Sequence, residues 1–209
     1  MKAPRWMLAI AVIAMATGAA HADKTTEEYV RINANEVLDS LNKPELSAEE
    51  RRAGFQRYMD EFANIDAIAR FTIGKYARRF TAEEMAEYTA AFRDYALATY
   101  EYYFYEYKGR EVDVTGSTDR NANDSIVDTK ILRGDGQEME VRWRVLNRGG
   151  KYQVVDVALN ADGNLIWLAI EQQAQFIALL DKSNGSAEKL TAKIKDMTRE
   201  VSAKAAELK

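Results

Sequence analysis

Hydrophobic residues repeat at helical intervals through the first half of the chain. Between residues 26 and 41, and again between residues 55 and 62, they fall on one face of a predicted helix. Ser47 and Glu50 stand three positions apart just ahead of the second stripe, a spacing typical of a capping box. The pattern therefore predicts two amphipathic helices, followed by a short third helix that ends near Gly74.

A long helix is predicted over about residues 82–107. Thr81 and Glu84 form a second capping-box pair at its start. Its last two turns crowd six aromatic rings into eight residues: Tyr100, Tyr102, Tyr103, Phe104, Tyr105 and Tyr107. At 100° per residue these rings cannot share one face. One side of this helix end is expected to pack on a sheet, and the other either to be exposed or to line a cavity.

The pattern then changes to the alternation of a β-sheet. Strands are predicted at residues 111–115, 125–133, 138–145 and 152–159, joined by turns such as Gly134-Asp135-Gly136. In the third, apolar residues at odd positions alternate with charged residues, as expected for a strand with one buried and one wet face.

Helical spacing returns over about residues 165–182 and again after Ser186, which can cap a last helix. Helices, a run of strands and further helices in that order are typical of an α+β fold. The prediction is a strongly twisted, four-stranded antiparallel sheet with helices packed on its concave face.

The N-terminus has the three parts of an export signal. Two basic residues precede the uncharged apolar run 6–16, and Ala20-His21-Ala22 supplies small residues at the positions that the protease reads. The run is shorter than the roughly 20 residues needed to cross a bilayer. We therefore predict a signal peptide at residues 1–22 and a single α+β domain at residues 23–209, exported to the periplasm.

Composition excludes several kinds of chemistry. Without residues 1–22 the chain has 27 basic and 33 acidic residues, which argues against nucleic-acid binding and against permanent residence on an anionic membrane. There is no Cys, and the only His is His21, inside the predicted signal. Zinc sites of the usual type and His-dependent nucleophile systems are thus not expected. No Walker, Gly-x-Gly-x-x-Gly or Gly-x-Ser-x-Gly motif occurs.

The remaining capacity is apolar and aromatic. Asp135 and Asp162 stand beside glycines and are interpreted as turn residues, with calcium binding as the weaker alternative. Each methylene moved from water to an apolar site gains about 0.8 kcal/mol, so a lipid needs a protein cavity to cross an aqueous space. We therefore expect a non-catalytic lipid carrier, with no metal and no cofactor besides the bound lipid.

A series of motifs resembles the MlaC / toluene-tolerance family, which includes the hopanoid-associated HpnM proteins. The series begins with the run from Phe62 through Ile65, Ile68-Ala69-Arg70-Phe71 and Ile73-Gly74-Lys75-Tyr76 to Arg78. It continues in the helix that ends at Tyr107 and in Gly150-Lys151-Tyr152-Gln153-Val154-Val155-Asp156-Val157. Two positions depart from that family's pattern: Ala77 stands where Trp is common, and Gln172-Gln173 stand near the usual Arg.

The resemblance implies a soluble periplasmic component of an ABC transport system. In that role the protein carries phospholipid between an outer-membrane lipoprotein complex and an inner-membrane ABC transporter with an MCE subunit, and contributes to outer-membrane lipid asymmetry. The acyl chains are expected between the curved sheet and the helices of a monomer.

Eight residues are predicted to line the cavity: Ile73, Tyr76, Phe92, Tyr95, Tyr103, Met139, Val141 and Trp143. Ordinary core packing is the alternative for each of them, since buried aromatic and branched residues are the default interior. Three other functions stay open: hopanoid-related lipid binding, a non-catalytic envelope interaction module, and an enzyme that uses an Asp/Glu pair on a cone-shaped fold.

Overall fold

A computed structural model describes residues 24–43, 45–107, 109–133, 136–161 and 163–207. The predicted signal peptide, Asp135 and Asp162 lie outside these ranges. The helices are α1 (Lys24–Leu41), α2 (Ala48–Phe62), α3 (Ile65–Thr72), the 3₁₀ helix η1 (Gly74–Arg78), α4 (Ala82–Tyr107), α5 (Leu168–Lys182) and α6 (Ala187–Glu207). None of the described helices is both long enough and apolar enough to span a membrane.

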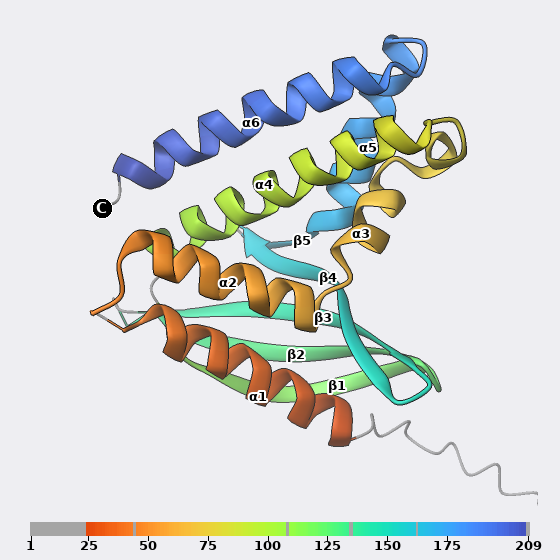
Figure 1. Ribbon diagram of the computed structural model, residues 1–209. Coiled ribbons are helices and arrows are strands. Elements are labelled where there is room, and N and C mark those ends of the chain that lie inside the picture. Colours follow the sequence, from red (N-terminus) through yellow and green to blue (C-terminus); the bar gives the residue numbers. More distant parts are fainter. Residues whose placement is uncertain (1–23, 44, 108, 134–135, 162, 208–209) are drawn as a thin grey trace, which may run out of the picture.

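The strands form one antiparallel sheet in chain order, β1-β2-β3-β4-β5. They are β1 (Gly109–Asn121), β2 (Asp124–Arg133), β3 (Glu138–Arg148), β4 (Lys151–Ala161) and β5 (Asn164–Trp167). The register shifts between β1 and β2 and once between β3 and β4, and such bulges strengthen the twist of a sheet. The helices gather on one side of this sheet, with α1 against β1 and β2, α2 against β4, and α4 and α6 farther away (Figure 1).

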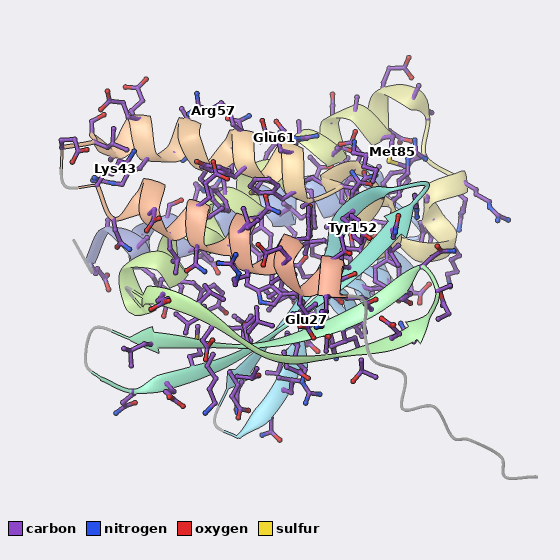
Figure 2. All side chains as sticks on the ribbon, turned by 90° about the horizontal axis from the view of Figure 1, so that it is seen from below. Glu27, Lys43, Arg57, Glu61, Met85 and Tyr152 are labelled. Atoms are coloured by element: carbon purple, nitrogen blue, oxygen red, sulfur yellow. The ribbon has the colours of Figure 1, made fainter. Side chains whose placement is uncertain are left out.

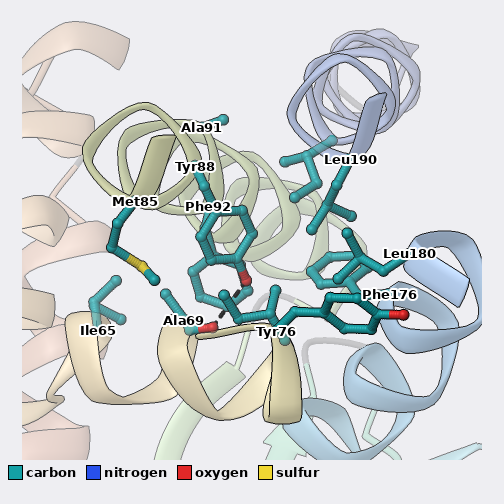
Figure 3. Close-up of a cluster of buried hydrophobic side chains, with 12 residues drawn as sticks. Ile65, Ala69, Tyr76, Met85, Tyr88, Ala91, Phe92, Phe176, Leu180 and Leu190 are labelled. Atoms are coloured by element: carbon teal, nitrogen blue, oxygen red, sulfur yellow. Dashed lines mark hydrogen bonds between the residues drawn. The ribbon is translucent and has the colours of Figure 1, made fainter. Parts of the chain in front are cut away.

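The main core lies among the helices rather than on the sheet. Residues from α3, η1, α4, α5 and α6 pack there, with Tyr88, Phe176 and Leu180 almost completely buried (Figure 3). The Tyr88 hydroxyl lies 2.6 Å from Thr72 Oγ1 and donates to the carbonyl oxygen of Ala69 at 2.9 Å. A polar group inside this core therefore has the partners that burial requires.

Helix α1 packs along β1, at one edge of the sheet. The Asn35 side chain bonds both backbone groups of Val112: Nδ2 donates to the carbonyl oxygen at 3.0 Å, and Oδ1 accepts the N–H at 2.8 Å. A small second cluster of Val30, Val127 and Val145 joins α1 to the sheet. These contacts hold α1 in place over the sheet at one end of the molecule.

The α+β class and both capping boxes are confirmed. Ser47 and Glu50 make the reciprocal bonds at the start of α2, and Thr81 and Glu84 do so at the start of α4. The predicted strand number is wrong, because Asn164–Trp167 pairs with β4 as a fifth strand instead of opening the next helix. Four residues are too few for a periodic signal, so pairing with β4 decides their conformation.

Candidate functional site

An apolar cavity of about 340 Å³ lies between the sheet and the helices. Residues from α1, α2 and α3, the middle and the last turns of α4, the start of α5 and strands β1–β4 line it. This volume falls at the lower end of the usual range for small-molecule sites.

Helices α1 and α2 contribute one apolar face each. The lining positions of α1 follow the helical period from Val30 through Ala34 to Leu38, and those of α2 include Phe55, Met59 and Phe62. Their opposite faces are polar, and Figure 2 shows Arg57 and Glu61 on the outward side of α2. The lining residues of these two helices are Tyr29, Val30, Asn33, Ala34, Val37, Leu38, Phe55, Tyr58, Met59 and Phe62.

Helix α4 lines the cavity and also packs in the core, and Phe92 takes part in both. Phe92, Ala96, Thr99 and Tyr103 follow one another at intervals of three or four residues, so they form a single row along the helix, and this row lines the cavity. Ala91 packs in the core instead. The helix therefore separates the closed part of the molecule from the open part.

The sheet contributes alternating side chains. Met139, Val141 and Trp143 of β3 point to the cavity, as the period of two in the sequence predicts. The indole N–H of Trp143 donates to Thr129 Oγ1 at 2.9 Å, and the Thr129 hydroxyl donates to the carbonyl oxygen of Val141 at 3.0 Å. The ring can face the cavity because its one polar atom is bonded within the sheet.

Several polar groups in the wall are bonded to the protein backbone. The Tyr29 hydroxyl donates to the carbonyl oxygen of Phe62 at 3.2 Å, and burial raises the pKa of Tyr29 to about 12. Asn33 Nδ2 donates to the carbonyl oxygen of Tyr29 at 2.6 Å. Thr99 is the exception, since its buried Oγ1 has no hydrogen-bond partner among the described residues. The surface offered to a ligand is consequently almost entirely apolar.

Asp156 is the carboxylate of the wall. Its Oδ1 accepts the N–H of Val157 and of Ala169, both at 2.9 Å, so it caps the start of α5, where Trp167 supplies no side-chain cap. Burial raises the pKa of this carboxyl, and the backbone N–H groups and Arg144 oppose that shift. A carboxylate engaged in this way is structural, because its acceptor atom is already occupied.

The structure brings together five of the eight predicted residues. Phe92, Tyr103, Met139, Val141 and Trp143 line the cavity.

The other three do not line it. Ile73 and Tyr76 are buried in the core among α3, η1, α5 and α6, and Tyr95 packs against that core. The Tyr76 hydroxyl donates to Asp181 Oδ1 at 2.6 Å, which turns this side chain toward α5 and away from the cavity. Tyr95 belongs to the apolar stripe of its helix, and Ile73 and Tyr76 belong to the family-like run. Neither pattern shows which neighbour a buried side chain meets.

Sequence reasoning missed the contribution of α1 and α2. The apolar stripes over residues 26–41 and 55–62 were the available signal, but a stripe that packs on a core and one that faces a cavity have the same composition. Gln172 also lines the cavity, whereas Gln173 donates to the carbonyl oxygen of Phe71 at 2.5 Å.

The cavity is suited to an apolar ligand, and few polar side chains line its wall. No group of His, Cys, Asp and Glu among the described residues could hold a metal ion. The fold and the cavity define an α+β protein with an apolar binding site roofed by helices.

The comparison with protein families identifies the group more closely. The family model described as "MlaC protein" matches residues 31–196, most of the chain, and the chain belongs to this family. The family resemblance predicted from the sequence is thus confirmed. No curated protein sequence matches the chain significantly.

A similar solved structure is that of a phospholipid-binding protein from Ralstonia solanacearum in complex with a phospholipid. It superposes with a TM-score of 0.62 at 19% sequence identity, and the match covers 84% of this chain and 97% of the other. At this identity the match establishes a shared fold.

Proposed function

We propose that this protein is a periplasmic lipid carrier that holds the acyl chains of a phospholipid in the cavity. The observation that carries the proposal is the cavity itself, because its wall is apolar on the sheet side and on the helix side. Hydrocarbon is the ligand chemistry that such a wall favours.

The energetics are adequate for a carrier. A chain of about 16 methylene groups gains roughly 13 kcal/mol on leaving water for an apolar site. The cavity and a bilayer both supply that environment, so transfer between them is close to balanced. Small differences in affinity can then decide the direction of transfer.

The comparisons support the same proposal. The chain belongs to the MlaC family, and the Ralstonia protein of the same fold is described as phospholipid-binding and contains a phospholipid. The partners expected for such a carrier are an inner-membrane ABC transporter with an MCE subunit and an outer-membrane lipoprotein complex. The predicted export signal at residues 1–22 is consistent with this location.

A catalytic role is not part of the proposal. The carboxylate of the cavity wall, Asp156, is bonded to backbone N–H groups at the start of α5. Asp124, which is also buried, is bonded by Arg120 at 3.0 Å and by Arg144 at 2.9 Å. Both carboxylates have structural partners.

The test is to extract lipid from protein purified from the periplasm and to identify it by mass spectrometry. We expect about one phospholipid per protein, because the water-filled alternative leaves a large apolar wall exposed. Ala96→Phe introduces a ring into the cavity and should lower the lipid content several-fold.

Ala90→Phe is the matched control, because Ala90 is exposed on the same helix. It should retain the full lipid content, and thermal unfolding followed by circular dichroism should show that both variants are folded. Lipid-free wild-type protein, or equal lipid content in a folded Ala96→Phe variant, contradicts the proposal.

A further inference from the structure

The motif that shows the family resemblance contains residues that the cavity does not use. The stretch 67–80 holds four cations and no acidic residue, in a chain with more acidic than basic residues overall. Ala69, Ile73 and Tyr76 in this stretch are buried, so core packing explains their presence. The exposed residues of the stretch remain to be explained.

These exposed residues lie where α3 and η1 meet α5. Gln173 of α5 bonds the carbonyl oxygen of Phe71 at 2.5 Å, and Lys75 Nζ lies 2.8 Å from Asp181 Oδ1. A Cβ atom at Gly74 would lie 2.9 Å from Ile177 Cδ1, and Gly74 has a φ of +50°. The close approach and the left-handed backbone both favour glycine at the position that joins the two elements.

Two large apolar side chains are exposed at this junction. Phe71 is 41% exposed and Ile170 is 50% exposed. Ile170 precedes Gln173 by three residues on α5, so it lies on the face of the helix that meets the end of α3. Exposed apolar side chains that share one place mark an interaction surface.

The cations of this stretch differ in whether they are paired. Among the described residues, Arg70 and Arg78 are exposed and have no ion pair, whereas Lys75 pairs with Asp181. The Arg79 guanidinium lies 5.0 Å from the centre of the Tyr76 ring, which fixes its position beside Gly185. The surface therefore carries two arginines without an ion pair, Arg70 and Arg78, beside the paired Lys75.

The same helices also form part of the cavity wall. Ile68 of α3 and Leu168 of α5 line the cavity, and Phe71 and Ile170 follow within one turn on the outside. A partner on this surface thus lies next to one wall of the cavity.

We propose that Arg70, Phe71, Lys75, Arg78 and Ile170 form a docking surface for an anionic phospholipid bilayer. The cations attract the headgroups, and Phe71 and Ile170 enter the boundary between headgroups and acyl chains. The surface lies outside the cavity, so the inference goes beyond the carrier function and is tested separately.

Charge complementarity favours this partner, and the overall acidity of the chain limits the contact. Basic residues near an anionic leaflet each strengthen binding about fivefold, and the effect decays within a Debye length. The rest of the protein carries excess negative charge, which the bilayer repels. Contact should therefore be brief and sensitive to salt, as a shuttling protein requires.

The test is flotation of the protein, without residues 1–22, with vesicles rich in phosphatidylglycerol and with vesicles of phosphatidylcholine alone. We expect binding to the anionic vesicles at low salt and its loss when salt is raised to about 0.5 M. The double variant R70E/R78E should lower the partition coefficient by at least about tenfold. F71S should also lower it, but its residual binding should keep the salt dependence.

Arg57→Glu is the control, because Arg57 is an exposed arginine on α2, away from this surface (Figure 2). It should bind as the wild type does, and circular dichroism should show that all variants are folded. Equal binding to both kinds of vesicle, or equal loss in R57E and R70E/R78E, overturns the proposal. Failure to bind vesicles, with salt-sensitive binding to an acidic protein instead, also overturns it. None of these outcomes changes the lipid content measured by extraction, so the two proposals fail independently.

Discussion

The core among α3–α6 and the cavity beneath α1 and α2 are built from the same kinds of residue, but only the first is filled. In the core, α6 packs along α4, and Leu190 and Ile194 are completely buried. In the cavity region, a small valine cluster and the hydrogen bonds between Asn35 and Val112 join α1 to the sheet, and about 340 Å³ stays open.

The difference shows that composition does not decide whether an interior closes. Helix α4 contributes to both regions, and Phe92 contacts Phe176 of the core while also lining the cavity. The packing of the elements decides the outcome, because five helices fill the core while the space between the sheet and the helices stays open. Stability is therefore expected from the core, and binding capacity from the cavity.

The largest change in the free energy of unfolding is expected for a Leu→Ala substitution in the core, compared with the same substitution in the cavity wall. Leu180 is fully buried in the core, whereas Leu159 lines the cavity. Leu180→Ala should lower the free energy of unfolding by about 3–5 kcal/mol, because it opens a hole in a filled region. Leu159→Ala should lower it by less than about 1.5 kcal/mol, because its side chain already faces free space. Chemical denaturation of lipid-free protein measures both values, and equal losses would erase the distinction between the regions.

A smaller effect is expected where the two regions join. Asp156 of β4 caps α5 through the N–H of Ala169, so it links a strand of the cavity to a helix of the core. Asp156→Ala should lower the free energy of unfolding by about 1–2 kcal/mol, because it leaves the start of α5 without a side-chain acceptor. Asp156→Asn retains an oxygen acceptor and should lose less in the same denaturation experiment. An Asn variant as unstable as the Ala variant would argue against capping.

The smallest effect concerns two tyrosines, one in each region. Burial raises the pKa of Tyr29 to about 12, and burial also raises the pKa of Tyr88, against the lowering effect of its bond with Thr72. The unfolded chain loses these phenol protons near pH 10, before the folded chain does. Stability should thus be unaffected by these groups below about pH 10 and should fall as the pH rises toward 12.

Denaturation at a series of alkaline pH values measures this decline. Tyr29→Phe and Tyr88→Phe should each make it shallower, and Tyr88→Phe should have the larger effect because Tyr88 is completely buried. A decline that is equally steep in both variants would show that these phenols do not cause it.

Much of the fold could be predicted from local signals. The capping residues Ser47 and Thr81 mark real helix starts, and the alternation in residues 138–145 gives the correct inner face of β3. Strand β5 could not be predicted, since Asn164–Trp167 is a strand only through its pairing with β4. Long-range pairing leaves no periodic pattern in four residues.

The site could be predicted only in part. Met139, Val141 and Trp143 were found because a strand has two faces and the sheet faces one cavity. Ile73 and Tyr76 pack in the core instead of lining the cavity, and the sequence does not tell which neighbour of a buried side chain is a cavity. The side chains of Tyr100, Phe104, Tyr105 and Tyr107 lie outside the described part of the structure.

The two hydrogen bonds between Asn35 and Val112 also affect how readily the edge of the sheet can pair with another molecule. Strand β1 forms one border of the sheet over 13 residues, and an unpaired border of that length can recruit a strand from another molecule. The amide of Asn35 occupies both backbone groups of Val112, as a neighbouring strand would. At the opposite border, β5 has only four residues before the chain becomes helical. Both borders are therefore less open to the edge-to-edge association that leads to fibrils.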